Sequence, residues 1–238
     1  MKIDILAIGA HPDDVELSCS GTLIRHITFG KTVGILDLTL GELGTRGDAV
    51  LRKKEAAEGA RIIGARFRDN MEFKDGFFEN NPEHQHKLIA RIRQYCPDII
   101  LCNAVTDRHP DHGRAAALVS EAAFYSGLRK INTQLDGKEQ QPWRPKAVYH
   151  YIQDRNIEPD FVVDISPWMD LKLQSVKAYT SQFYDPSSKE PETPISTNQF
   201  LEFLIARNRH HGRDIGVDYA EAFTAERSPG INNLFDLR

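Results

Sequence analysis

The sequence contains the tripeptide His-Pro-Asp twice, at two distant points of the chain. The first copy is His11-Pro12-Asp13, which is followed by Asp14, and the second is His109-Pro110-Asp111, which is followed by His112. The composition predicts only about 0.04 copies in a chain of this length. A lone copy is typical of a turn whose aspartate caps a helix. Two copies indicate a chemical role.

Imidazole nitrogens and carboxylate oxygens are ligands that zinc prefers, and three protein ligands leave a fourth position for water. Such an open site is catalytic rather than structural. His109 and His112 are three residues apart, which places them on one face at the start of a helix. Adjacent residues of a tight loop point in different directions. We therefore expect Asp13 and Asp14 to differ in role, one binding the metal and the other facing the water.

Both motifs follow segments that are typical of buried strands. Ile3–Ala10 is a continuous apolar run, and Ile99–Cys102 is a shorter one. Further strands are predicted at 32–40, 147–152 and 161–165, and helices at 15–29, 49–63, 82–95, 113–125, 168–183 and 197–211. This alternation predicts an α/β fold with a Rossmann-like, mostly parallel sheet and helices on both faces. Such sheets bind ligands at the carboxyl ends of their strands, where both motifs lie.

The length of 238 residues predicts one domain over 1–238. Within it, residues 127–145 are rich in Gly, Pro, Asn and Gln and predict an excursion, and 184–197 carries three prolines and predicts an exposed flap. The net charge of −4 argues against a nucleic-acid partner, and the apolar runs are too short to span a membrane. Three scattered cysteines suit a reducing cytoplasm.

The segments Ala10–Asp14 (AHPDD) and His109–His112 (HPDH) resemble the motifs of the LmbE-like, PIG-L type zinc-dependent N-deacetylases. The similarity covers nearly the whole chain, through 37–39, 41–47, 51–52, 107–112, 164–166, 178–183 and 216–221. Within the family, these features look most like the bacillithiol-biosynthesis deacetylases. The resemblance therefore implies an LmbE-like fold and removal of acetyl from N-acetylglucosaminyl malate, a small amino-sugar conjugate.

The resemblance also implies roles for individual residues. His11, Asp14 and His112 would bind Zn²⁺, with Fe²⁺ as the alternative ion, and Asp13 would be the general base. The imidazolium of His109 would stabilise the oxyanion, and Asp111 would orient that ring. The mycothiol branch of the family has a tyrosine where this chain has Asp107, and an ionised carboxylate cannot donate a hydrogen bond to the oxyanion.

Four further residues are candidates for substrate binding. Arg52 and Arg108 match positions that contact substrate carboxylates in bacillithiol-type relatives, and the planar fork of arginine suits carboxylates. Arg46 is a weaker candidate. Glu42 would meet a sugar hydroxyl or brace its loop. The relatives imply a homo-oligomer, a hexamer in the bacillithiol type.

Several alternatives stay open. Within the family, the alternative substrates are another N-acetylated sugar and a thiol conjugate. Outside it, two histidines and a carboxylate also form the facial triad of non-haem iron oxygenases, although those sites usually occur on jelly-roll barrels. The first strand, loop and helix also resemble a nucleotide-binding module, but His11 and Pro12 stand where glycines of GxGxxG would be.

Overall fold

The structure is a computed structural model that describes residues 1–236. The strands are β1 (Ile5–Gly9), β2 (Val33–Thr39), β3 (Phe67–Phe73), β4 (Ile99–Cys102), β5 (Gln134–Leu135), β6 (Lys138–Glu139), β7 (Ala147–Tyr151), β8 (Phe161–Asp164) and β9 (Ala220–Ala225). The helices are α1 (Asp14–Thr28), α2 (Ala49–Ile63), α3 (Pro82–Tyr95), α4 (Pro110–Tyr125), η1 (Ser166–Trp168), α5 (Met169–Lys177), α6 (Asn198–Asp214) and η2 (Leu234–Asp236).

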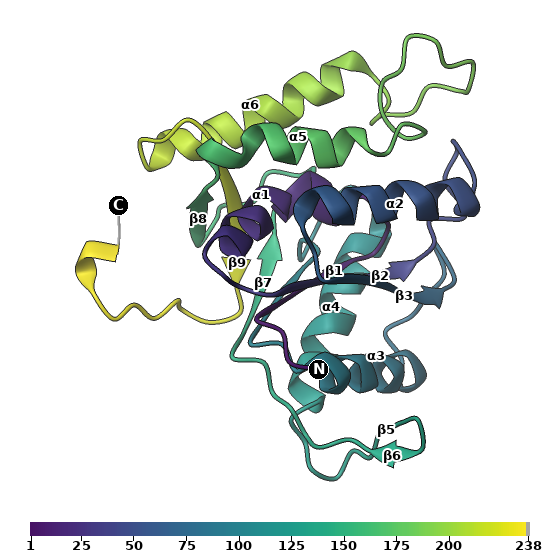
Figure 1. The fold of residues 1–238 in the computed structure, drawn as a ribbon, viewed down its shortest axis with the longest axis vertical. Coiled ribbons are helices and arrows are strands. Elements are labelled where there is room, and N and C mark those ends of the chain that lie inside the picture. The colour runs from purple at the N-terminus through teal and green to yellow at the C-terminus, as the bar shows by residue number, and fades with distance from the viewer. Residues whose placement is uncertain (237–238) are drawn as a thin grey trace.

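The main sheet has seven strands in the order β3-β2-β1-β4-β7-β9-β8. The first five strands in this order, β3, β2, β1, β4 and β7, pair in parallel. Strand β9 is antiparallel to both of its neighbours, β7 and β8. Figure 1 shows α1 and α2 on one face of the sheet and α3 and α4 on the other, with α5 and α6 forming an outer layer over α1 and α2. The structure confirms the predicted Rossmann-like fold.

The strand order reverses between β1 and β4. From β1 the chain moves outward to β2 and β3, and then returns to place β4 on the other side of β1. At such a switch point, the loops after the two central strands diverge and leave a crevice for a ligand. The two His-Pro-Asp motifs follow β1 and β4, so the topology places both of them at this crevice.

Local signals explain why several elements match their predicted bounds. The Asp48 side chain accepts a hydrogen bond from Leu51 N at the start of α2, and Gly64 ends that helix with φ of 84°. Asn81 caps α3 in the same way, before Pro82. Glycine is needed in the loop before α2 because the loop backbone lies close to Arg52: a Cβ on Gly44 would lie 2.8 Å from the Arg52 guanidinium.

Other elements differ from the prediction. Strands β3 and β9 were not expected, and only Phe73 of β3 is fully buried, as in an edge strand with a weak sequence pattern. Helix α4 begins at Pro110 rather than Gly113, because His109 caps it. Helix α5 ends at Lys177 rather than at residue 183. Beyond it, Ser181 binds Glu55 instead of continuing the helix.

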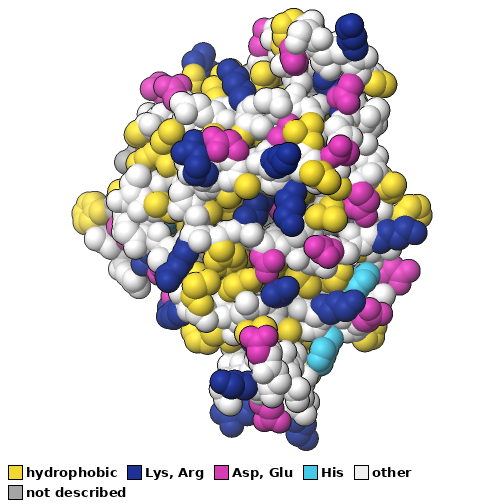
Figure 2. Space-filling model, turned by 45° about the vertical axis from the view of Figure 1, so that its right-hand side comes forward, with side chains coloured by type: hydrophobic (Ala, Val, Ile, Leu, Met, Phe, Trp, Pro, Cys, Tyr) yellow, Lys and Arg dark blue, Asp and Glu magenta, His cyan; other side chains and the backbone are white. Residues whose placement is uncertain are grey.

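Two segments stand out from the sheet and its helices. Residues 127–145 include the β5-β6 hairpin, and Arg93 of α3 anchors this segment through the carbonyls of Ser126, Leu128 and Ile131. Residues 184–197 run as a loop before α6. Among residues 1–236, none of the helices combines the length and apolar character that a membrane span needs. On the face shown in Figure 2, side chains of both charges are interspersed with hydrophobic ones.

Candidate metal and catalytic site

A pocket of about 320 Å³ opens where β1 and β4 end. Its walls come from the first turn of α1, the Gly-rich loop, the start of α4, the loop after β7, and the segment before α6. The side chains of both motifs that reach it are His11, Asp13, Asp14, His109 and His112. The fold thus brings the two distant motifs into one cavity, as the sequence predicts.

The His11 ring is held by two carboxylates. Its Nε2 lies 3.0 Å from Asp75 Oδ1 and 3.3 Å from Asp111 Oδ2. Because carboxylates only accept hydrogen bonds, Nε2 carries a proton, and Nδ1 is the ring nitrogen that is available to a metal. Asp111 is itself fixed by Gly76 N and Arg114. Its carboxylate therefore orients His11, whereas the contact of Asp111 with His109 is made by its backbone N–H.

His112 has a similar arrangement on the other side of the pocket. Its Nδ1 donates to Asp107 Oδ2 at 2.5 Å, and its Nε2 lies 3.1 Å from Asp14 Oδ1. Asp107 also accepts from Asp154 N and Arg155 N, so it is firmly placed. The residue that stands in place of a tyrosine thus orients a predicted metal ligand, leaving Nε2 to face Asp14.

Asp14 stands between the two imidazoles. Its Oδ2 lies 3.7 Å from His11 Nδ1, and its Oδ1 faces His112 Nε2. Two buried amides also hold this carboxylate: Asn103 Nδ2 donates to Oδ2 at 2.9 Å, and Gln153 Nε2 donates to Oδ1 at 3.0 Å. The amides bind each other at 3.0 Å. We call Asn103 and Gln153 the amide clamp.

The surroundings of these residues fit a divalent cation. Burial lowers the pKa of His11, but the hydrogen bonds that its ring donates to Asp111 and Asp75 outweigh this effect and raise the pKa to about 10. The pKa of His112 is raised to about 9, because Asp14 and Asp107 outweigh burial. Such shifts report an excess of negative charge, which a bound cation would neutralise. Ring nitrogens of His11, His109 and His112 also lie within 4.8 Å of one another.

Asp13 is buried next to the predicted ligands and is bound by a cation. Arg52 Nη2 donates to Asp13 Oδ2 at 2.6 Å and also to Pro12 O at 3.1 Å. Burial raises the pKa of Asp13 to about 6, although the Arg52 charge opposes the shift. The backbone of Asp13 has φ of 126°, a conformation that L residues rarely adopt. This turn directs the Asp13 and Asp14 carboxylates differently.

His109 has its proton on the nitrogen that faces away from the helix. Its Nδ1 accepts a hydrogen bond from Asp111 N at 3.2 Å, so the neutral ring carries its proton on Nε2. Burial and the neighbouring His11 and His112 lower its pKa. The structure therefore presents His109 as a neutral donor rather than the imidazolium that the sequence led us to expect, and its ring is oriented by the backbone of Asp111.

The predicted substrate residues separate into two groups. Arg52 and Arg108 line the pocket, but Arg52 is engaged with Asp13, and Arg108 pairs with Asp154 at 2.9 Å while remaining half exposed. Arg46 instead points to the segment 184–197, where it binds Ser188 and Glu190, and it also donates to the carbonyl of Phe183, just before that segment. Glu42 accepts from Asp75 N, which supports its bracing role.

Four residues of the site were not predicted from the sequence: Asp75, Asn103, Gln153 and Arg207. Asn103 follows β4 directly and Gln153 follows β7 closely, so a polar residue after a predicted strand was the available signal. Asp75 follows β3, which was itself missed. Arg207 reaches the pocket from α6 and donates to the carbonyls of Gln153 and Leu17, a contact with no local sequence signal.

Comparisons with known proteins agree with this geometry. Residues 6–123 match the PIG-L family, described as GlcNAc-PI de-N-acetylase. A diacetylchitobiose deacetylase of Thermococcus kodakarensis is 30% identical over 189 residues, which cover 75% of this chain and 70% of that protein. A probable N-acetyl-alpha-D-glucosaminyl L-malate deacetylase 2 of Bacillus anthracis is 24% identical over 196 residues, or 75% of this chain and 81% of the relative.

A solved structure extends the similarity to the whole fold. The conserved protein TT1542 from Thermus thermophilus is 36% identical, with a TM-score of 0.86 and coverage of 98% of both chains. The family match and the deacetylase relative thus show an N-deacetylase, and the site fits the metal dependence of that family, which sets aside the oxygenase and nucleotide-binding alternatives. The chain belongs to the PIG-L/LmbE-like deacetylase family.

Proposed function

We propose that this protein removes the N-acetyl group from an N-acetylglucosamine conjugate, using one divalent ion held by His11, Asp14 and His112. The observation that carries the proposal is the pairing of these residues with a separate carboxylate: two imidazoles keep one nitrogen each for a ligand, while Asp13 binds Arg52 instead. We propose Zn²⁺ as the ion, because it favours two imidazoles and a carboxylate with an open fourth position. The three free cysteines support a cytoplasmic setting.

The ion would polarise the acetyl carbonyl and lower the pKa of a nearby water. Asp13 accepts the proton of that water as its oxygen adds to the acetyl carbon. A carboxylate with a pKa near 6 suits this role, because it is ionised at neutral pH and still basic enough to take a proton. The Arg52 contact holds the carboxylate in place.

His109 then stabilises the developing oxyanion by donating a hydrogen bond from Nε2. A fixed donor in a buried pocket is effective because it needs no reorganisation during the reaction. The C–N bond breaks, and Asp13 returns its proton to the leaving nitrogen. The products are acetate and the protonated amino sugar: Asp13 carries one proton of the water to the nitrogen, and the acetic acid that is formed releases the other to the amine.

The aglycone of the conjugate is the finer part of the proposal. The resemblance to bacillithiol-type enzymes supports a malate conjugate, whose carboxylates would meet Arg108, the half-exposed arginine at the pocket. Because Arg52 is already bound by Asp13, the pocket provides fewer free cations than the sequence suggests. The similarity to a diacetylchitobiose deacetylase therefore favours a second candidate, a neutral disaccharide.

Acetate release from N-acetylglucosaminyl malate, diacetylchitobiose and N-acetylglucosamine tests the proposal. We expect Asp13→Asn to retain its bound metal and to lose about 10²–10⁴-fold in turnover. Asp170→Asn, at an exposed carboxylate of α5, is the matched control and should leave turnover unchanged. Full activity of Asp13→Asn would exclude the general-base role. Arg108→Gln should raise KM for the malate conjugate more than for diacetylchitobiose, and equal effects would remove the malate assignment.

A further inference from the structure

The pocket of the proposed metal site contains three arginines, and two of them are already paired with carboxylates. Arg52 donates to Asp13 at 2.6 Å, and Arg108 lies 2.9 Å from Asp154. Arg207 of α6 lines the same pocket, but it forms no ion pair with any carboxylate of residues 1–236. The pocket therefore holds one cation whose counter-charge is missing.

The groups that hold Arg207 in place are neutral. Its guanidinium donates to the carbonyl oxygens of Gln153 and Leu17, and its Cζ lies 5.8 Å from the centre of the Phe203 ring. A guanidinium has five N–H donors, and these two carbonyls do not engage all of them. The side chain is thus fixed at the pocket wall with donors and a full positive charge to spare.

Carboxylates act on Arg207 only from a distance. Burial lowers the pKa of Arg207, and the charges of Asp154, Glu221 and Asp107 oppose this effect without cancelling it. These three carboxylates are engaged elsewhere, with Arg108, Lys172 and His112, respectively. The pKa of Arg52, which has a carboxylate in direct contact, is raised instead. The comparison shows what a direct counter-charge would supply to Arg207.

A second polar group of the same wall also lacks a partner. Ser18 follows Leu17, the residue of α1 whose carbonyl binds Arg207. It lines the pocket, is only 3% exposed, and its hydroxyl has no hydrogen bond within the described part of the chain. The buried Ser20 hydroxyl, in contrast, donates to the carbonyl of Glu16 at 2.7 Å. Since buried hydroxyls are nearly always hydrogen-bonded, Ser18 indicates a ligand that enters this side of the pocket.

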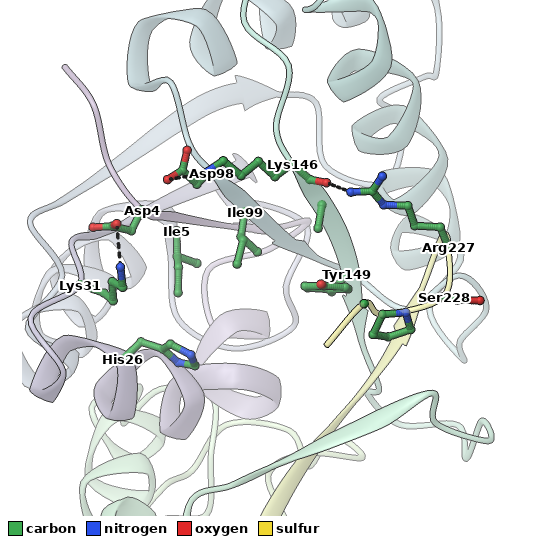
Figure 3. Close-up of a pocket in the computed structure, with 13 residues that line it drawn as sticks. Asp4, Ile5, His26, Lys31, Asp98, Ile99, Lys146, Tyr149, Arg227 and Ser228 are labelled. Carbon is green, nitrogen blue, oxygen red and sulfur yellow. Dashed lines mark hydrogen bonds and ion pairs between the residues drawn. The ribbon is translucent and has the colours of Figure 1, made fainter. Parts of the chain in front are cut away.

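A larger pocket, of about 630 Å³ and formed where β1, β4 and β7 begin, provides a contrast. Lys31 lies 3.4 Å from Asp4 there, and Lys146 lies 3.5 Å from Asp98. Figure 3 shows these four residues around the apolar centre of the pocket, together with Arg227. Because Arg227 is exposed, water can solvate its charge. The cations of this pocket need no ligand, whereas the largely buried Arg207 does.

We propose that Arg207 and Ser18 bind a carboxylate on the aglycone of the substrate and thereby determine its specificity. The inference rests on the proposed deacetylase function, and it favours the malate conjugate over the neutral disaccharide. A carboxylate accepts hydrogen bonds from both the guanidinium and the hydroxyl, and such charge-assisted bonds are strong. It also supplies the counter-charge that Arg207 lacks, which a neutral sugar hydroxyl cannot do.

The selectivity of the enzyme for an anionic substrate tests this inference. The measured quantity is the ratio of kcat/KM for N-acetylglucosaminyl malate to kcat/KM for diacetylchitobiose. We expect Arg207→Gln to lower this ratio by about tenfold or more and Ser18→Ala by about threefold, through KM rather than kcat. Arg213→Gln removes an exposed charge of the same helix and should keep the wild-type ratio. An unchanged ratio in both pocket variants would overturn the proposal.

The Ser18 variant also separates binding from folding, should Arg207→Gln fail to fold. Because the Ser18 hydroxyl has no partner to lose, Ser18→Ala should melt at or above the wild-type temperature while its selectivity falls. Ser20→Ala is the matched control on the same helix. It removes the hydrogen bond to Glu16, so it should melt at a lower temperature and keep the wild-type selectivity. The opposite pattern would assign Ser18 a structural role and contradict the proposal.

Binding to the metal-free protein distinguishes a failure of this inference from a failure of the proposed function. Calorimetric titration with glucosaminyl malate should give a dissociation constant that Arg207→Gln raises by about tenfold and Arg213→Gln leaves unchanged. This pattern without acetate release from any substrate would support the carboxylate site and refute deacetylation. Absence of binding to the wild type, or binding that Arg207→Gln does not weaken, would overturn the inference.

The product acetate is the other carboxylate that could reach this wall. Inhibition by sodium acetate should therefore be compared in wild type and Arg207→Gln. We expect equal inhibition of both, because the acetyl group reacts at the metal and not at Arg207. Inhibition that Arg207→Gln relieves, with unchanged selectivity for the malate conjugate, would assign Arg207 to the product and overturn the proposal.

Discussion

Asp14, a proposed metal ligand, accepts hydrogen bonds from several buried donors. These donors determine which lone pairs of its carboxylate oxygens remain for an ion. The amide clamp occupies one direction at each oxygen, through Asn103 at Oδ2 and Gln153 at Oδ1. Asn103 is fully buried and Gln153 nearly so, so neither has water as a substitute partner. The clamp therefore restricts the Asp14 carboxylate to the orientation that faces the imidazoles.

Removing half of the amide clamp should weaken metal binding without removing a ligand. We expect Gln153→Met to reduce the affinity for Zn²⁺ or Co²⁺ by about 10–100-fold, the usual effect of losing a group that orients a ligand. Competition with a chelator measures this affinity, and the melting temperature of the metal-free protein reports on the fold.

A buried amide at the same pocket provides the control for the clamp. Gln182 donates to the carbonyl of Arg46 and to Ser181, away from Asp14. Gln182→Met should therefore leave metal affinity unchanged. Equal affinities for Gln153→Met and wild type would contradict the role of the clamp.

The predicted ligands could be identified from sequence because their types and spacing repeat in two motifs. The carboxylates that accept hydrogen bonds from the His11 and His112 rings could not be identified in this way. The direction of the Asp111 side chain depends on how the first turn of α4 meets the loop that contains Gly76, whose N–H fixes the carboxylate. The contact between Arg52 and Asp13 likewise depends on how the loop 41–47 folds around the guanidinium.

At the scale of elements, the buried ion pair of Lys172 and Glu221 binds the backbone of α1. Lys172 of α5 donates to the carbonyls of Glu16 and Leu17, and Glu221 of β9 accepts from Gly21 N and Thr22 N. The two charges meet at 2.6 Å. Because α1 begins at Asp14, this pair connects the proposed metal site to α5 and β9.

Removing one charge of this ion pair should lower the stability of the protein. Glu221→Gln leaves the Lys172 ammonium without a counter-charge in a fully buried position, and we expect the free energy of unfolding to fall by about 3–5 kcal/mol. Adding Lys172→Met to this variant removes the uncompensated charge, so the double variant should lose less than the sum of the single losses. Urea unfolding measures all three, and additive losses would refute the coupling.

The elements that sequence predicted best are those with strong local signals. Helices α2 and α3 begin after capping Asp48 and Asn81, and the residues after them, Gly64 and Cys96, adopt left-handed backbone conformations. Strand β9 had no such signal, because its place between β7 and β8 depends on antiparallel pairing with distant strands. The length of α5 was wrong because the polar contacts of residues 181–182 outweigh their helical pattern.

For the whole molecule, one buried histidine makes stability depend on pH. His211 of α6 has a pKa lowered from 6.5 to about 4 by burial, with the charges of Arg207 and His210 adding to the effect. The unfolded chain therefore binds a proton at this residue before the folded one does. The contribution of His211 to stability should be undiminished above pH 6.5 and should fall as the pH decreases toward 4.

Replacing this histidine isolates its share of the acid sensitivity. We expect the melting temperature of His211→Gln to change less than that of wild type between pH 6.5 and 4. His210→Gln is the neighbouring control, since residue 210 is exposed, and it should retain the steeper slope. Parallel slopes for wild type and His211→Gln would show that other groups control the acid response.

The backbone of Asp13 has a consequence for how this protein evolves. Holding a non-glycine residue at such a dihedral angle costs on the order of 1–3 kcal/mol in every folded molecule, with or without substrate. Glycine at this point would relieve the distortion and delete the base in a single step. The same change would leave the buried Arg52 guanidinium without its carboxylate, so the relief of backbone strain is opposed by the loss of an ion pair, and the distorted turn persists together with the base.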